Sequence, residues 1–188
     1  MILFVTAGAL FFFMTAWFVV SLIQKRNDVA DIAWGLGFVF VAWISWYVGA
    51  QGPRAFLANS LVTVWGLRLA FHIFQRNAGK PEDARYRSWR ESWGSWFILR
   101  TYLQVFLLQG VFLFFIASPI FVIAAAGPVG FSILDLLGVC IWSIGFFFET
   151  VGDSQLREFV KNPANRGKLL TTGLWRYSRH PNYFGEVS

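Results

Sequence analysis

Acidic and basic side chains recur at every fourth position near the C-terminal end of the sequence. They are Glu149, Asp153, Arg157 and Lys161. Residues four apart lie on one face of an α-helix, so the spacing predicts that these side chains stack along a continuing helix. A ladder of salt bridges on a solvated helix face would explain the spacing on its own.

The segment that follows, residues 165–183, concentrates groups that bind nucleotides. It combines arginine and lysine with hydroxyls, side-chain amides and the aromatic rings of Trp175, Tyr177 and Tyr183. Guanidinium and ammonium groups bind phosphate oxygens, aromatic rings stack on flat ligands, and Asn or Asp side chains hydrogen-bond to ribose or amide groups. A dinucleotide or adenosyl cofactor fits these groups, and so does the headgroup of an anionic lipid.

Ionisable side chains also occur at or inside apolar segments, where they are costly. Arg68 and His72 are four apart and share a helix face, either lining a polar cavity or extending toward lipid phosphates. Asp28 and Asp31 precede an apolar run and suit helix capping, while Asp31 also shares a face with Trp34 beside small residues. Two distant histidines and a single cysteine do not predict a metal site.

The elements that must position these groups are apolar helices. The chain of 188 residues is 56% hydrophobic, 20% aromatic and only 14% charged, which excludes a water-soluble domain and intrinsic disorder. Five apolar runs are long enough to cross a hydrocarbon core of ~30 Å. They cover residues 1–23, 32–50, 55–74, 101–126 and 131–151. No segment alternates as a membrane β-strand does, so we predict an all-α, polytopic transmembrane helix bundle.

Basic residues are distributed unevenly between the connections that join these runs. Of the 16 lysines and arginines, all but Arg54 and Arg68 lie in residues 24–31, in residues 75–100 or after residue 151. Cytoplasmic loops carry an excess of Lys and Arg, so the pattern predicts an N-terminus outside and these three segments in the cytoplasm. It also accounts for the formal net charge of +6 without nucleic-acid binding. We expect an integral protein of a bacterial inner membrane, with membrane lipids as partners.

The end of the sequence predicts a further helix. Residues 178–185, with Pro181 in the first turn, have the pattern of a helix start, yet the chain stops at Ser188. We therefore expect a C-terminally truncated form of a longer protein that lacks at least one span. The chain is predicted to be a single membrane domain, residues 1–188, in which residues 152–188 form a cytoplasmic cofactor-binding segment leading into a missing span.

The residues from Glu149 to Glu186 resemble the C-terminal domain family of steroid 5α-reductases. Together with Asp31-Ile32-Ala33-Trp34-Gly35 and Trp65-Gly66-Leu67-Arg68-Leu69, they look most like the bacterial branch known as DUF1295. The resemblance covers nearly the whole chain and implies a seven-helix membrane bundle for the full-length protein. The better-understood relatives, steroid and sterol reductases, bind NADPH from the cytosolic side and reduce a carbon–carbon double bond.

Carried over position by position, the resemblance implies NADPH contacts along the C-terminal segment. The implied cofactor-binding residues are Glu149, Asp153, Arg157, Lys161, Tyr177, Arg179, His180, Asn182 and Glu186. Asp153, Arg157 and Asn182 match the family pattern best, whereas the steroid enzymes commonly have Asn where this chain has Glu149. Sterol reductases and isoprenylcysteine methyltransferases share a related Arg-His-Pro-like stretch, so His180 does not by itself select NADPH.

Enone reduction also needs an acid that polarises the carbonyl as enolate charge develops. A Glu–Tyr pair from the N-terminal half does this in the steroid enzymes, and no Glu occurs in the first 81 residues here. We expect Asp31 to substitute, with Tyr47, Tyr86 or Tyr102 as candidate partners and Tyr102 as the assigned catalytic residue.

The predicted function is therefore that of a membrane-embedded, NADPH-dependent reductase of a carbon–carbon double bond. Its substrate is expected to be a lipophilic small molecule, steroid-like or isoprenoid. Two alternatives stay open at this point: a membrane methyltransferase that uses S-adenosylmethionine, and a non-enzymatic lipid-binding membrane protein.

Overall fold

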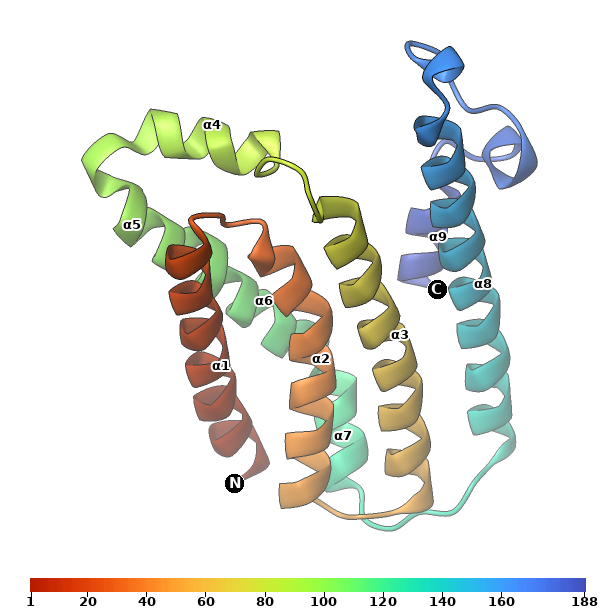
Figure 1. The fold of residues 1–188 in the computed structure, drawn as a ribbon. Helices are drawn as coiled ribbons and strands as arrows, with labels where there is room; N and C mark the ends of the chain where they lie inside the picture. Colours follow the sequence, from red (N-terminus) through yellow and green to blue (C-terminus); the bar gives the residue numbers. More distant parts are fainter. The chain divides into compact units, whose positions relative to one another are not determined.

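The protein is built from helices and their connections. The computed structural model describes residues 1–188, which divide into two compact units, Met1–Gly130 and Phe131–Ser188. The chain has no strand, and five of its helical segments are long and apolar enough to cross a membrane (Figure 1). The prediction of an all-α, polytopic helix bundle is therefore confirmed.

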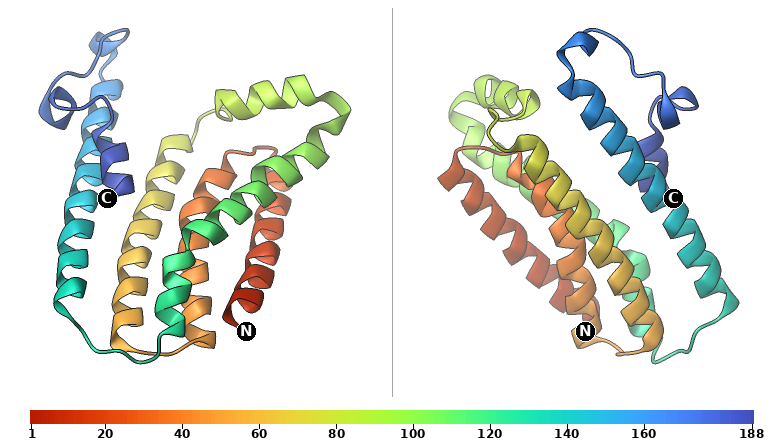
Figure 2. Two further views of the ribbon diagram at one scale, coloured as in Figure 1. Left: turned by 180° about the vertical axis from the view of Figure 1, so that it is seen from behind. Right: turned by 45° about the vertical axis from the view of Figure 1, so that its right-hand side comes forward.

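Three long helices form the body of the first unit. They are α1 (Ile2–Gln24), α2 (Val29–Val48) and α3 (Pro53–Asn77), and they lie side by side with short connections (Figures 1 and 2). Lys25 ends α1 in the left-handed conformation, with φ of 53°. Pro53 begins α3, where a missing backbone N–H costs nothing.

The predicted span 101–126 is part of a longer, bent segment. The segment comprises α4 (Ala84–Trp93), a 3₁₀ turn (Gly94–Trp96), α5 (Phe97–Arg100), a π-helical stretch (Thr101–Leu107), α6 (Leu108–Ile116) and α7 (Ser118–Ala125). α4 crosses the ends of α1 and α2, and the chain then turns back along them (Figure 2). Gly94, with φ of 49°, permits the change of direction because it lacks a Cβ atom.

Close contact between α2 and α3 depends on two glycines. A Cβ atom on Gly35 would lie 2.7 Å from the Gly66 carbonyl oxygen, and a Cβ atom on Gly66 would lie 2.6 Å from the Gly35 oxygen. The small residues beside Asp31 thus allow the close helix approach that the sequence predicted. The core of the unit includes Met14, Phe106 and Leu113, all fully buried.

The second unit consists of one long helix and a segment that folds back on it. α8 (Ile133–Lys161) is capped by Ser132, whose backbone N–H donates to the Asp135 carboxylate at 2.6 Å. The predicted continuation of this helix to Lys161 is confirmed. The chain then passes through two 3₁₀ turns, Pro163–Asn165 and Gly173–Arg176, into α9 (Pro181–Val187), whose predicted start at Pro181 is also confirmed.

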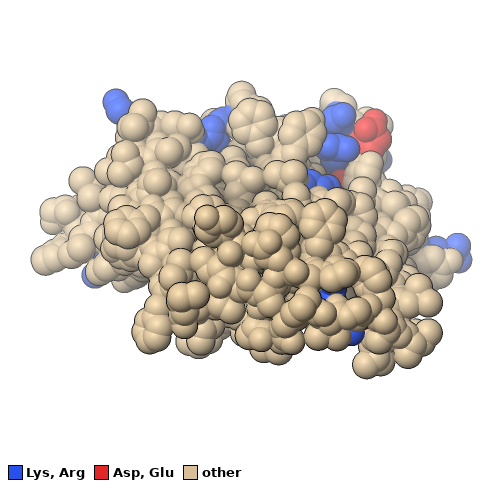
Figure 3. Space-filling model, turned by 90° about the horizontal axis from the view of Figure 1, so that it is seen from below, with Lys and Arg blue, Asp and Glu red and all other residues tan.

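Charged side chains are few at one end of the first unit. In the face seen from below in Figure 3, nearly all visible atoms belong to uncharged residues. In the first unit this is the end where α1 begins and α2 ends, and Arg54 is the basic residue there. The arrangement agrees with the uneven distribution of Lys and Arg, while the side of the membrane on which each end lies stays a prediction.

Candidate functional site

Asp31 is the centre of a polar cluster at the end of the first unit that α4 crosses. Its Oδ1 atom accepts a hydrogen bond of 2.7 Å from the Tyr86 hydroxyl. Its Oδ2 atom lies 3.5 Å from the Arg85 guanidinium and 3.7 Å from that of Arg76. Tyr86 is 3% exposed, and the Asp31 side chain is 18% exposed. One carboxylate therefore faces a buried phenol and two partly exposed cations.

Aromatic rings line the helices next to Asp31. Trp34 lies one turn along α2 and meets Phe38 edge to face, with 5.3 Å between the ring centroids. Phe38 meets Trp65 of α3 in the same way at 5.4 Å. The hydrogen-bonded Asp31–Tyr86 pair thus stands beside an apolar aromatic wall, formed by Trp34, Phe38 and Trp65, that belongs to the core of the unit.

A second set of polar contacts holds the α1–α2 connection against residues 82–90. Arg26 donates two hydrogen bonds of 2.6 Å to Asp28, which raises the pKa of Arg26. The backbone N–H of Asn27 donates to Glu82 at 2.6 Å, and Glu82 also pairs with Arg90 at 3.1 Å. These contacts fix the connection that precedes Asp31.

Asp83 begins α4 and helps to place Tyr86. Its carboxylate accepts a hydrogen bond of 2.9 Å from the backbone N–H of Arg85, as expected for a residue that caps a helix. Burial alone would raise the pKa of Asp83, but the backbone and side-chain hydrogen bonds of Arg85 lower it below the ordinary value. Asp28, at the cap position of α2, uses its carboxylate instead to accept from the Asp83 N–H at 3.3 Å.

The structure joins Asp31 to Tyr86 rather than to Tyr102. The Tyr102 hydroxyl shares a hydrogen bond of 3.0 Å with Thr15, and its ring packs on Phe18. Tyr47 is 75% exposed. Helical spacing could not choose among the three tyrosines, because Tyr86 reaches Asp31 only through the turn of α4 across the helix ends.

Gln109 is a member of this cluster that the sequence did not single out. Its side chain is a neighbour of Tyr86, and its Oε1 atom is buried without a partner. An unpaired buried acceptor is costly and marks a place where a ligand or water can donate. Gln109 lies on α6, in an apolar run of the sequence where two isolated glutamines gave no pattern.

In the second unit, the predicted residues Asp153 and Asn182 come together. The Asn182 side-chain amide donates a hydrogen bond of 3.0 Å to Asp153 Oδ1. Gly152 makes the contact possible, since a Cβ atom there would lie 3.1 Å from the Asn182 backbone nitrogen. Asn182 Oδ1 is buried and has no partner, so the pair presents an acceptor that a bound group can satisfy.

The other predicted residues of α8 have different surroundings. Glu149 is 3% exposed. Gly185 of α9 packs closely against the backbone of α8 at Glu149. Arg157 follows Asp153 on α8 and is exposed. Lys161, the last residue of the helix, lies 3.7 Å from Glu158, a pair that is exposed on both sides.

The predicted residues of the returning segment lie mostly at the surface. Tyr177 is 83% exposed, and Arg179 and Glu186 are also exposed. The His180 ring stacks on Tyr183 with 4.9 Å between centroids. These groups offer a cation and flat rings to a ligand near Asn182, while Glu149 contributes to the packing of α9.

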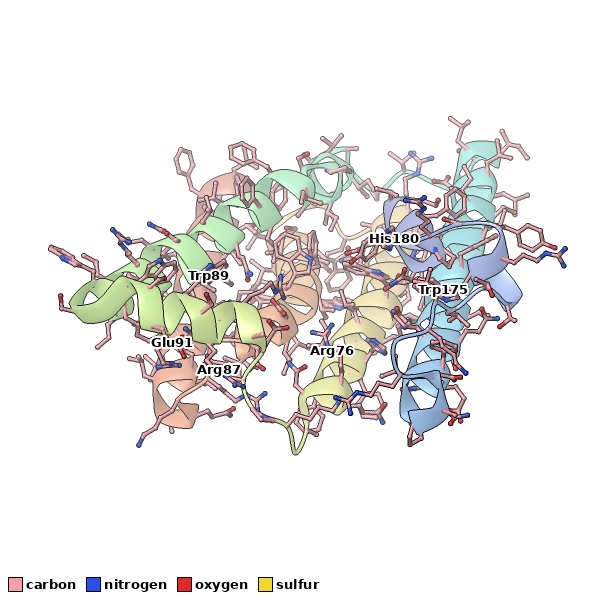
Figure 4. All side chains as sticks on the ribbon, turned by 90° about the horizontal axis from the view of Figure 1, so that it is seen from above. Arg76, Arg87, Trp89, Glu91, Trp175 and His180 are labelled. Carbon is pink, nitrogen blue, oxygen red and sulfur yellow. The ribbon has the colours of Figure 1, made fainter.

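Two contacts that the sequence did not predict attach the second 3₁₀ turn to α8. The Gln155 side chain accepts a hydrogen bond of 3.0 Å from the backbone N–H of Leu174. The Trp175 indole N–H donates to the Gly152 carbonyl oxygen, also at 3.0 Å. Figure 4 shows Trp175 and His180 on the segment that returns along α8. Gln155 lies off the four-residue repeat of charges, so the repeat gave no signal for it.

Comparison with known proteins gives one match that covers most of the chain. The family described as "Protein of unknown function (DUF1295)" matches residues 17–188. An uncharacterized protein of Schizosaccharomyces pombe is 24% identical over 189 residues, covering 88% of this chain and 54% of the yeast protein. The chain thus spans about half the length of that relative.

A second curated relative matches a short stretch. A probable O-methyltransferase of Ustilaginoidea virens, ustE, is 44% identical over 46 residues, which cover 24% of this chain and 16% of that protein. No solved structure gives a significant match.

Proposed function

The chain belongs to the DUF1295 family of proteins of unknown function, and we propose that it acts as a membrane-embedded, NADPH-dependent reductase of a carbon–carbon double bond. The substrate in this proposal is lipophilic, steroid-like or isoprenoid. The observation that carries the proposal is the hydrogen bond of 2.7 Å between Asp31 and Tyr86 beside the aromatic wall of the first unit. The activity, substrate and partners are proposed for the whole protein, of which this chain can be a part.

The first unit supplies the acid that enone reduction needs. When hydride reaches the β-carbon, negative charge develops on the carbonyl oxygen and must be stabilised. The Tyr86 hydroxyl has one proton, which it donates to Asp31 in the structure. In our proposal it donates this proton to the substrate oxygen instead when substrate binds, and the Arg85 and Arg76 guanidinium groups then stabilise the Asp31 carboxylate that has lost its donor. Before substrate binds, the hydrogen bond to Asp31 holds the Tyr86 hydroxyl in place. The proposal thus replaces Tyr102 by Tyr86 as the partner of Asp31.

The second unit supplies groups that fit NADPH. The unpartnered Asn182 Oδ1 atom can accept a hydrogen bond from an amide or a ribose hydroxyl, and Asp153 holds the Asn182 side chain in place. Arg157 and Arg179 suit phosphate oxygens, and the stacked His180 and Tyr183 rings suit a flat base. When bound, NADPH would supply the hydride. We propose that this unit lies on the cytoplasmic side, where the positive-inside rule puts its cations.

A methyltransferase that uses S-adenosylmethionine is the second candidate. The short match to a probable O-methyltransferase favours it, and the same cations and aromatic rings would hold an adenosyl group. The Asp31–Tyr86 pair favours the reductase, because stabilising a developing enolate is a task of reduction and methyl transfer involves none.

Thermal unfolding of the detergent-solubilised full-length protein distinguishes these functions. A ligand at 100 times its Kd stabilises the folded state by about 2.7 kcal/mol, which raises Tm measurably. A reductase should be stabilised by NADPH, and this effect should disappear in Asn182→Ala. Stabilisation by S-adenosylmethionine alone would support the methyltransferase, and no response to either would refute both.

Turnover separates the roles of the two units. With a panel of lipophilic enones, Tyr86→Phe should retain the NADPH-induced rise in Tm but lose most of its NADPH oxidation. Tyr102→Phe serves as the matched control and should oxidise NADPH at the wild-type rate. If Tyr86→Phe also turns over at the wild-type rate, the assignment of Tyr86 is wrong.

A further inference from the structure

α4 carries cations and aromatic rings that the proposed reaction does not use. The helix crosses the ends of α1 and α2 and does not continue a span (Figure 1). The buried Tyr86 side chain and the Asp83 cap fix its beginning, and Gly94 ends it. Its position is therefore set by the fold, and the surface it presents is a permanent feature of the first unit.

The apolar surface of the first unit ends beside α4. On α1, Ile23 is 75% exposed only two residues before Lys25. On the other side of α4, Trp96 is 61% and Ile98 is 59% exposed. In a membrane-spanning unit such exposed apolar side chains contact lipid tails, so the hydrocarbon layer reaches to the level of α4. α4 consequently lies at the depth of the lipid headgroups.

Tryptophan rings on α4 suit this depth. Trp89 stacks on Trp93 with 5.3 Å between centroids and an interplanar angle of 11°. Tryptophan is enriched at membrane–water interfaces, where the ring faces the apolar side and the N–H faces water. Figure 4 shows Trp89 on one flank of α4 and Arg87 and Glu91 on the other, so the two flanks of the helix differ in polarity.

Two cations beside α4 have no carboxylate partner. Arg90 is already held by Glu82 at 3.1 Å and lies over the Phe97 ring at 4.3 Å. Lys25 and Arg87 are exposed and form no ion pair, and the Arg87 guanidinium donates one hydrogen bond of 3.0 Å to the Glu82 carbonyl oxygen. They border the same part of α4, because Arg87 precedes Arg90 by one turn and Arg90 donates to the Lys25 carbonyl oxygen at 3.2 Å.

We propose that α4 is an interfacial helix that binds the headgroup of an anionic phospholipid between Lys25 and Arg87. The ammonium and guanidinium groups donate to the phosphate oxygens, and the tryptophans hold α4 at headgroup depth. A zwitterionic headgroup brings its own cation, which these two cations repel, so the surface prefers a net negative lipid. Glu91, on the Arg87 flank, opposes the phosphate and keeps the affinity moderate.

Native mass spectrometry of the detergent-solubilised full-length protein tests the proposal with phosphatidylglycerol and phosphatidylcholine of identical acyl chains. Phosphatidylglycerol should be retained more tightly by the wild type. The double variant Lys25→Gln/Arg87→Gln should bind it about 30-fold more weakly, and Glu91→Gln about fivefold more tightly, as expected for two cations and one anion at an anionic lipid surface. Soluble glycerol phosphate should not compete.

A matched control removes the same charges elsewhere. Arg166→Gln/Lys168→Gln also replaces one arginine and one lysine, both exposed and both in the second unit, and should bind phosphatidylglycerol like the wild type. The proposal is overturned if the α4 variant binds as tightly as the wild type, or if the control loses as much as the α4 variant.

A depth measurement keeps the proposal falsifiable if the α4 variant does not fold. Cys140 is the sole cysteine of the chain, so Cys140→Ser allows a spin label at a single new position, Ser92→Cys on α4. Accessibility to oxygen and to a polar nickel complex should place the label at the headgroups of a nanodisc. A label in bulk water or at the bilayer centre would contradict the interfacial position.

Discussion

The contact between Gly35 and Gly66 makes a quantitative prediction about the first unit. In Gly66→Ala, the new Cβ atom would lie 2.6 Å from the Gly35 carbonyl oxygen and 2.7 Å from Val39 Cγ2. Ordinary contact begins at 3.4 Å, so α2 and α3 must separate locally by about 0.8 Å, the difference between 3.4 and 2.6 Å. Overpacking of this kind costs ~1–3 kcal/mol. Replacing a helical glycine by alanine returns about 1 kcal/mol, which leaves a net loss of up to about 2 kcal/mol.

Gly8→Ala isolates the contribution of helix propensity. Gly8 lies in α1, and a Cβ atom there would meet nothing within 4 Å. This variant should be as stable as the wild type or more stable by up to ~1 kcal/mol. Reversible unfolding in mixed detergent micelles with increasing dodecyl sulfate gives both free energies of unfolding under the same conditions.

The double variant Gly35→Ala/Gly66→Ala tests whether one contact is responsible. Each new Cβ atom would be too close to the backbone of the facing helix at the same α2–α3 contact. A separation of the two helices that makes room for one Cβ atom therefore also makes room for the other. The double variant should therefore lose less stability than the sum of the single variants. Our account of the α2–α3 contact is refuted if Gly66→Ala proves as stable as Gly8→Ala, or if the two losses are additive.

Three further predictions concern polar side chains, all measured by the same unfolding assay. Tyr86→Phe leaves Asp31 Oδ1 without its donor in a largely buried site and should cost about 1–3 kcal/mol; an unchanged stability would contradict the hydrogen bond. Tyr102→Phe should cost less, ~1 kcal/mol or below, because its hydroxyl partner Thr15 keeps a second bond of 2.8 Å to the Phe11 carbonyl. The pKa of Asp83 is lowered on folding, so its carboxylate stabilises the fold above the ordinary pKa of Asp, and this contribution is lost as pH falls through the folded-state pKa. Asp83→Asn should accordingly be less stable near neutral pH and lose less stability than the wild type below about pH 4, and identical pH profiles would show that Asp83 makes no such contribution.

The spans were predictable because each is an apolar run of sufficient length. The continuation of α8 to Lys161 followed from the four-residue repeat of charges, and the start of α9 followed from Pro181. Local sequence could not show that residues 84–93 form a helix across the ends of α1 and α2, since a short amphipathic run fits several orientations. The turn depends on Gly94, and a glycine in the sequence does not by itself reveal that its φ is positive.

The candidate site was predictable to the extent that its members lie on one helix or match the family pattern. Asp153 and Asn182 were expected to share a site, and their side chains form a hydrogen bond. The partner of Asp31 was open among three tyrosines, because 55 residues separate it from Tyr86 and the separation is closed by tertiary structure alone. Gln109 is a similar case, since its role depends on facing Tyr86.

The π-helical stretch Thr101–Leu107 has a consequence for how the bent fourth segment can be altered. Hydrogen bonds in such a stretch span five residues instead of four, so it accommodates one residue more than a regular helix of the same rise. Every side chain after it is rotated about the helix axis relative to the α-helical phase set by α5. Deleting one residue from this stretch would restore regular winding and rotate Gln109 about the helix axis, away from its present direction, although no side chain near Asp31 had been replaced.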